Sequence, residues 1–151
     1  MSIGFFSYFP LDNKKFLHYV PILFSFFNGR GVNMRNKYLS SIEQETTPFE
    51  SSEEAWFWYC LCEKEKSNGR SQHRSKITRP CETTDIFIAV KKLLRLGILK
   101  PYHIKVLAKY GFQQVPPHPH FGDSSTICRL WQEALDFLER LLIKKGIVFN
   151  S

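Results

Sequence analysis

The chain has 151 residues, of which 43% are hydrophobic and 15% aromatic, which is enough for one domain with a buried core. Its 21 Lys and Arg residues against 14 Asp and Glu residues give a formal net charge of +7. This balance favours a polyanionic partner, either nucleic acid or an anionic membrane surface, although many small proteins carry such a charge without one. The four cysteines do not make a secreted disulfide framework in a chain this long, so we expect buried free thiols in a reducing cytoplasm.

Residues 1–33 form an aromatic-rich extension that follows neither a helical nor a strand period. Its apolar run from Phe16 to Phe27 is interrupted by Pro21 and is shorter than the ~20 residues of a membrane span. We therefore expect no integral membrane span. Three interpretations stay open: a mis-assigned start, with translation beginning at Met34; a membrane-associating or targeting segment; and an irregular, disordered extension. Residues 34–50 are polar and are expected to be flexible.

A helical domain is predicted over residues 51–148, and its first helix covers Ser51–Lys66. Ser51 and Glu54 fit a capping box at its start. The residues expected to share its buried face are Ala55, Trp58, Leu61 and Cys62. Because Trp56, Phe57 and Tyr59 spread over the other faces, this helix is either buried on two sides or presents aromatic side chains to a partner.

Residues 66–80 hold five Lys and Arg residues and no acidic residue, and their Ser, Asn and Gly content predicts a loop. One interpretation is a solvated linker. The other is a mobile arm that binds phosphates and gains affinity by releasing counterions. The candidate phosphate contacts of this arm are Arg70, Arg74, Lys76 and Arg79.

Two short amphipathic helices, Thr84–Leu96 and Pro101–Tyr110, follow and form the most informative stretch of the chain. Gly97 has the place of a left-handed C-terminal cap, Pro101 suits a first helical position, and Gly111 is expected to end the second helix. Ile98 and Leu99 are expected to tuck under the turn between the helices. The basic residues left on the outer faces are Lys91, Lys92, Arg95, Lys105 and Lys109.

This pair resembles a helix-turn-helix, in which the second helix would enter the major groove and basic residues would hold phosphates. Tyr102 and Lys105 lie near the start of that helix, within reach of base edges. His103 departs from the usual pattern, because it falls where a buried apolar residue is expected.

The last helix is predicted from Ser124 or Ser125 to Lys145, with an apolar stripe that includes Trp131. His118 and His120 lie in the proline-rigid connector before it. The spacing of His118-Pro-His120 and of Cys60-x-Cys62 fits zinc ligands poorly, so no metal and no cofactor are expected. We also expect no enzyme, because the phosphate-loop, nucleophile-elbow and metalloprotease motifs are absent. Cys81 lies next to a helix N-terminus, a place that can lower the pKa of a thiol, but the sequence ties no candidate base to it.

Four segments resemble a set of small uncharacterised alphaproteobacterial proteins. They begin at Glu53 (EEAWFW), Arg79 (RPCE), Leu130 (LWQEAL) and Lys145 (KGIV). The resemblance covers residues 49–148 and leaves residues 1–33 outside. It implies a bacterial intracellular protein and carries over no functional residues.

The sequence therefore predicts an all-α domain of four main helices with a helix-turn-helix-like pair. The leading functional hypothesis is binding of DNA or RNA, in a regulatory role. The alternative is a protein-interaction adaptor that uses the aromatic helix over residues 52–65. The oligomeric state is left open.

Overall fold

The computed structural model describes residues 45–69 and 77–151. These residues form helices α3 (Ser52–Ser67), α4 (Thr83–Arg95), α5 (Pro101–Gln113) and α6 (Ser125–Lys144), with a short 3-10 helix, η2 (Pro119–Phe121), before α6. Phe49, before α3, and Val148, after α6, form an isolated parallel bridge. The described part of the chain contains no strand. The prediction of an all-α domain with four main helices is confirmed. The predictions for residues 1–44, including the start at Met34, lie outside the described residues.

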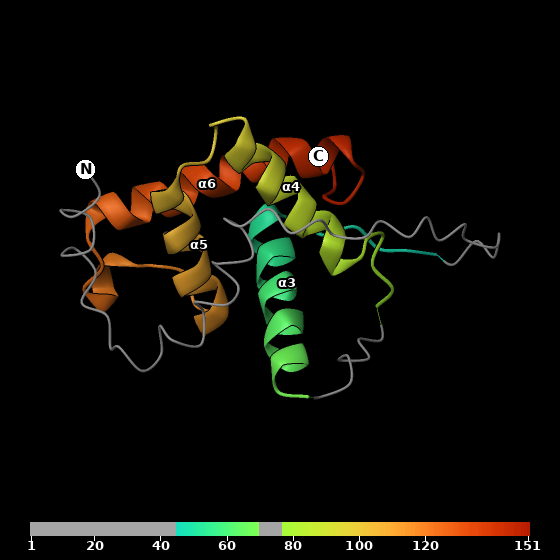
Figure 1. Cartoon of the computed structure of the whole chain (residues 1–151), viewed down its shortest axis with the longest axis horizontal. Helices are drawn as coiled ribbons and strands as arrows, with labels where there is room; N and C mark the ends of the chain where they lie inside the picture. Colours follow the sequence, from blue (N-terminus) through green and yellow to red (C-terminus); the bar gives the residue numbers. More distant parts are fainter. Residues whose placement is uncertain (1–44, 70–76) are drawn as a thin grey trace.

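Helices α3 and α6 together hold the two shorter helices in place. The long helix α6 runs across the molecule, and α3 stands crosswise to it (Figure 1). Helix α5 packs against both α3 and α6, and α4 packs against the same two helices. The four helices therefore share one core, and the α4–α5 turn lies at its edge.

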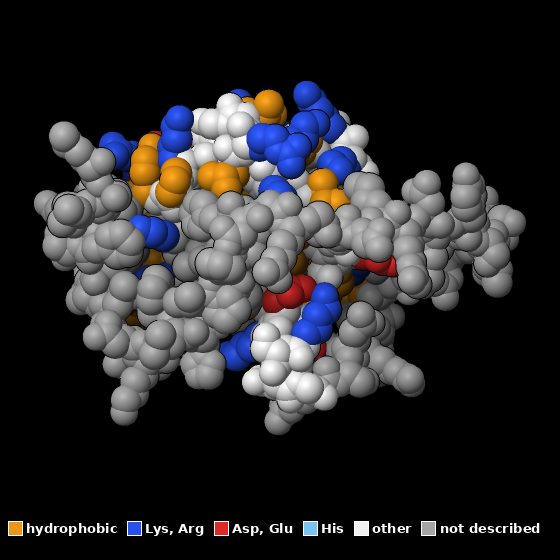
Figure 2. Space-filling model, in the orientation of Figure 1, with side chains coloured by type: hydrophobic (Ala, Val, Ile, Leu, Met, Phe, Trp, Pro, Cys, Tyr) orange, Lys and Arg blue, Asp and Glu red, His pale blue; other side chains and the backbone are white. Residues whose placement is uncertain are grey.

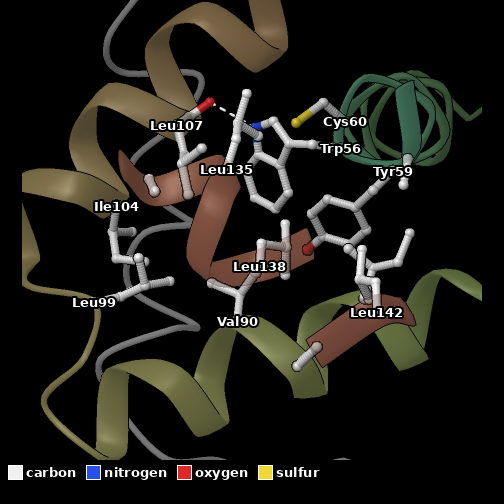
Figure 3. Packing of buried hydrophobic residues seen from close by; sticks show 14 of the residues in the cluster. Trp56, Tyr59, Cys60, Val90, Leu99, Ile104, Leu107, Leu135, Leu138 and Leu142 are labelled. Carbon is white, nitrogen blue, oxygen red and sulfur yellow. Dashed lines mark hydrogen bonds between the residues drawn. The ribbon is translucent and has the colours of Figure 1, made fainter. Parts of the chain in front are cut away.

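The core is one continuous cluster to which each of the four α-helices contributes (Figure 3). Its largest fully buried side chains include Trp56 from α3, Val90 from α4, Leu107 from α5 and Leu138 from α6. Trp131, in the predicted stripe of α6, is also buried and donates its indole N–H to Glu53 at 3.1 Å. Burial of this apolar surface is the main driving force for joining the helices.

The buried face of α3 differs from the predicted one. Its buried residues are Ser52, Ala55, Trp56, Tyr59 and Cys60. Trp58, Leu61 and Cys62, which were expected on the buried face, are only partly buried. Because Phe57 and Trp58 also pack against the core, the helix is covered on more than one side, and no aromatic side chain of α3 is fully exposed.

The turn between α4 and α5 is closed by Gly97, as predicted, with φ at +73°. The amide of Gly97 donates to the carbonyl of Leu94 at 3.1 Å, and the amide of Ile98 donates to the carbonyl of Leu93 at 3.0 Å. These two hydrogen bonds make a Schellman motif. Leu99 tucks under the turn and is 1% exposed. Ile98 does not, since 40% of it is exposed.

Gly111 does not end the second helix of this pair, contrary to the prediction. Helix α5 continues to Gln113 and is capped by Gln114 in the left-handed conformation, with φ at 58°. Gly111 instead lies against α3, where the indole N–H of Trp56 donates to the carbonyl of Leu107 at 2.8 Å. A Cβ atom at Gly111 would collide with the indole nitrogen of Trp56 and lie 2.6 Å from the sulfur of Cys60. The glycine is therefore a packing requirement of the α3–α5 crossing.

The residues just before α3 belong to the domain. The amide of Phe49 bonds the carbonyl of Ile147 at 2.9 Å, and the amide of Phe149 bonds the carbonyl of Phe49 at 2.8 Å. Phe49 is fully buried and packs against Trp58 with ring centroids 5.3 Å apart. The end of the segment predicted to be flexible is thus held against the C-terminal tail.

We predict that Gly111→Ala destabilises the fold by about 1–3 kcal/mol, because the added Cβ displaces the Trp56 indole from the Leu107 carbonyl. Chemical denaturation measures this free energy of unfolding. The sign of the change in stability tests the packing argument, because replacing glycine by alanine in an unobstructed helix stabilises that helix by about 1 kcal/mol. Gln113→Ala, at an exposed position of the same helix, is the control and should change stability by less than about 0.5 kcal/mol. A more stable Gly111→Ala variant would contradict the packing argument.

Candidate functional site

Positive charge is concentrated on α4, α5 and the turn between them. Between Asp85 and Asp123 the chain carries six Lys and Arg residues and no Asp or Glu. We call this set the basic corner: Lys91, Lys92, Arg95, Lys100, Lys105 and Lys109. Five of the six were predicted. Lys100 was missed, and the signal that could have found it is the long stretch without a carboxylate.

The fold turns these side chains outward because the opposite face of each helix is apolar. Lys92, Arg95 and Lys100 are exposed, and no described carboxylate lies within ion-pair distance of any of them. Lys91 and Lys109 are half-buried and lie over the rings of Phe87 and Tyr110, at 5.9 and 4.9 Å from the ring centroids. The cations of the basic corner therefore lie in two environments: Lys92, Arg95 and Lys100 project into solvent, whereas Lys91 and Lys109 lie over aromatic rings.

Helix α5 exposes only a narrow polar stripe. Eight of its 13 residues are buried. Of the other five, Pro101 begins the helix, and the polar stripe consists of Tyr102, Lys105, Lys109 and Gln113. Burial lowers the pKa of the Lys105 ammonium from its ordinary value. Because burial penalises the charged form, an anion placed next to Lys105 would offset part of that cost.

The net charge of the described part is small, but its basic and acidic residues are unevenly distributed. Of the 21 Lys and Arg residues, eight lie in residues 1–44 and 70–76, which leaves 13 in the described part. Of the 14 Asp and Glu residues, two lie in those same segments, which leaves 12. In Figure 2, Lys and Arg side chains are most numerous over the upper edge, where α4 and the C-terminal end of α6 lie. The larger acidic patches lie lower, beside α3, where further Lys and Arg side chains are also in view.

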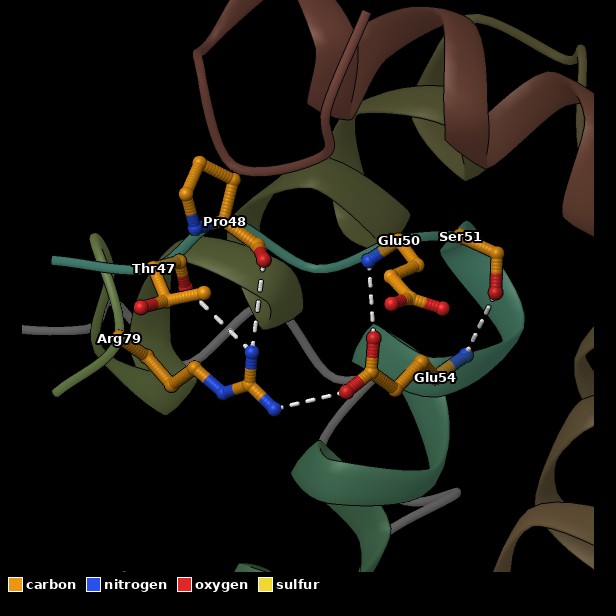
Figure 4. Close-up of polar contacts among 6 residues, drawn as sticks. All are labelled: Thr47, Pro48, Glu50, Ser51, Glu54 and Arg79. Atoms are coloured by element: carbon orange, nitrogen blue, oxygen red, sulfur yellow. Dashed lines mark hydrogen bonds and ion pairs between the residues drawn. The ribbon is translucent and has the colours of Figure 1, made fainter. Parts of the chain in front are cut away.

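Arg79, a predicted phosphate contact, is instead engaged inside the domain (Figure 4). Its guanidinium lies 4.1 Å from the centre of the Phe49 ring, and its Nη2 bonds Oε1 of Glu54 at 2.7 Å. Its Nη1 lies 3.4 Å from the carbonyl oxygens of Thr47 and Pro48. The side chain is 13% exposed, so this network fastens the segment before α3 to the segment before α4. The other three residues of the predicted arm, Arg70, Arg74 and Lys76, lie outside the described residues.

The four cysteines are free thiols, as expected, but only Cys60 is buried, whereas Cys62, Cys81 and Cys128 are partly buried. The helix N-terminus beside Cys81 does not lower the pKa of its thiol: burial, helped by the Asp85 carboxylate, raises that pKa to about 12. Burial also raises the pKa of Cys60 and of Cys62. Since the thiolate is the reactive form, these sites disfavour thiol chemistry.

The two connector histidines stack on each other, with ring centroids 4.7 Å apart. Nδ1 of His118 accepts a hydrogen bond from the amide of His120 at 3.1 Å. Within residues 45–69 and 77–151, no three His, Cys, Asp or Glu side chains are placed so that they could hold a metal ion together. None of the described helices is both long and apolar enough to cross a membrane.

Comparison with known proteins gives no match: no family model, no curated protein and no solved structure is significantly similar to this chain.

We predict that Arg79→Ala lowers the free energy of unfolding by about 1–3 kcal/mol, because it leaves Glu54 unpaired and uncovers the Phe49 ring. Thermal or chemical denaturation is the measurement. Lys66→Ala removes a surface ion pair with Glu63 and should cost less than about 0.5 kcal/mol. Equal effects of the two substitutions would show that the Arg79 network is not structural.

We predict that Cys81 is alkylated by iodoacetamide at pH 8 at least about tenfold more slowly than a small-molecule thiol, because its raised pKa leaves little thiolate. Time-resolved mass spectrometry of the peptide containing Cys81 gives the rate. The fold favours the neutral thiol of Cys81 over the thiolate. This preference stabilises the folded chain below pH 9.0, the ordinary pKa of the thiol, and the stabilisation is lost as the pH rises toward about 12. Alkylation as fast as that of the small thiol would contradict the assignment.

Proposed function

We propose that this chain binds nucleic acid through the basic corner, in a bacterial cytoplasm and in a regulatory role. The observation that carries the proposal is the run from Asp85 to Asp123, in which every charged side chain between these two residues is Lys or Arg. Clustered cations on one face are what a polyanionic backbone recognises, whereas the same charges interleaved with carboxylates would cancel.

In this proposal the exposed cations of α4 and of the turn contact phosphates. Lys92, Arg95 and Lys100 have no described carboxylate partner to give up, so their binding to phosphate costs no internal ion pair. A neighbouring anion would stabilise the charged form of Lys105, which burial disfavours, as its lowered pKa shows.

The helix-turn-helix interpretation gives α5 the role of the helix that reads bases. Its exposed stripe is the only face of α5 that a groove could receive, and Tyr102 and Lys105 lie at the start of that stripe. A single exposed face on a helix held by two others is the arrangement that major-groove recognition uses. The charged arm that contains Arg70, Arg74 and Lys76 would add sequence-independent phosphate contacts.

The adaptor alternative has less support. It needs aromatic side chains of α3 to be available to a partner, yet Trp56 and Tyr59 are buried and Phe57 and Trp58 pack against the core.

The test is the salt dependence of binding to labelled DNA and RNA duplexes, measured by fluorescence anisotropy between about 50 and 200 mM salt. We predict that the affinity falls steeply over this range. The double substitution Lys92→Gln and Arg95→Gln should flatten the slope of log affinity against log salt by about 0.9 for each phosphate that the protein no longer neutralises. Tyr102 and Lys105 substitutions should alter preference between sequences more than overall affinity.

The matched control is Lys64→Gln with Lys66→Gln, which removes the same charge from the last turn of α3, outside the basic corner. It should leave the slope near that of the unmodified chain. Equal effects of the two double substitutions would mean that binding follows net charge rather than the basic corner. If the unmodified chain shows no salt-dependent binding, the proposed function is wrong.

A further inference from the structure

His103 is a buried titratable side chain that the proposed function does not use. It is 3% exposed and lies in the first turn of α5, three residues after Lys100, the N-cap residue that precedes the helix. Its ring lies against Tyr102, with centroids 4.6 Å apart, and meets Phe137 of α6 edge-on at 6.2 Å. An apolar side chain would fill this place, so the polar ring needs an explanation.

Both ring nitrogens have partners, and the partners fix the tautomer. The backbone amide of Lys100 lies 3.0 Å from Nδ1, and Oε2 of Glu133 lies 3.2 Å from Nε2. An amide N–H can only donate, so Nδ1 must carry a lone pair. The ring proton is therefore on Nε2, where it is donated to the Glu133 carboxylate. In this neutral state His103 caps an N-terminal amide of α5 and also joins α5 to α6.

Protonation makes these two contacts incompatible with each other. A proton on Nδ1 would face the Lys100 amide, so two donors would point at each other and the cap would be lost. The charged ring would at the same time bind the Glu133 carboxylate more strongly. We propose that His103 is a pH-sensitive latch: its neutral ring closes the first turn of α5, and its protonation releases the Lys100 amide and loosens that turn.

The charged and titratable groups around the ring act in opposite directions. Glu133 favours the charged ring, but its other oxygen lies 3.7 Å from Nε of Arg129, which competes for the carboxylate. On the side of α5 the neighbours are Lys100 and Tyr102. The latch rests on hydrogen-bond geometry alone, so it holds whether or not the basic corner binds nucleic acid.

The test is NMR of the ¹⁵N-labelled full chain from pH 8 to pH 5, the interval that histidine titrations in proteins ordinarily span. At pH 8 the His103 ring should be the neutral tautomer with its proton on Nε2. As the ring takes up its second proton, protection of the Lys100 amide against exchange, corrected for intrinsic rates, should fall about fivefold, the equivalent of losing one helix cap.

His103→Gln is the decisive variant, because glutamine at this third helical position can accept from the same amide but does not titrate. Its Lys100 amide should keep its protection down to pH 5. His118→Gln, at an exposed histidine, is the control and should retain the unmodified pH dependence. If His103→Gln fails to fold, the titration of the unmodified chain decides. A proton on Nδ1 at pH 8, or a Lys100 amide whose protection does not change between pH 8 and 5, would overturn the proposal, as would the same loss in His103→Gln.

Discussion

The contact between Trp56 and α5 is the constraint on which the rest of this domain depends. The indole of Trp56 reaches the carbonyl of Leu107 only because Gly111, one turn later, leaves the space open. That contact brings α3 and α5 close together and buries most of the surface of α5. With α6 on another side, α5 retains one narrow stripe for solvent, so its lysines have a single direction in which to point.

The basic corner is a product of segregation, and this changes how the overall charge should be understood. The described part of the chain is close to neutral, so its positive surface exists because the carboxylates are placed elsewhere. Glu54 is paired with Arg79, and Glu133 with His103 and Arg129. Most of the excess charge lies in residues 1–44 and 70–76. The proposed function would thus combine a structured basic face with sequence-encoded charge outside it.

The sequence predicted well those features that depend on local periodicity. The amphipathic stripes of α4 and α6 and the left-handed cap at Gly97 are encoded within a few residues, and each was predicted correctly. The buried face of α3 was predicted wrongly because aromatic side chains occupy every side of that helix, so periodicity cannot choose between them. Gly111 was misassigned because its role comes from a partner on α3, more than 50 residues earlier. Arg79 and His103 have partners 25 and 30 residues away in sequence, and only the fold reveals them.

The most direct test of the central claim is a map of where nucleic acid touches the folded chain. Amide chemical shifts of the ¹⁵N-labelled full chain would be followed as a short DNA or RNA duplex is added at low salt. The account predicts shift changes concentrated at the basic corner, from Lys91 to Lys109, with α3 largely unaffected. Changes confined to residues outside the corner, or no changes at all, would contradict it.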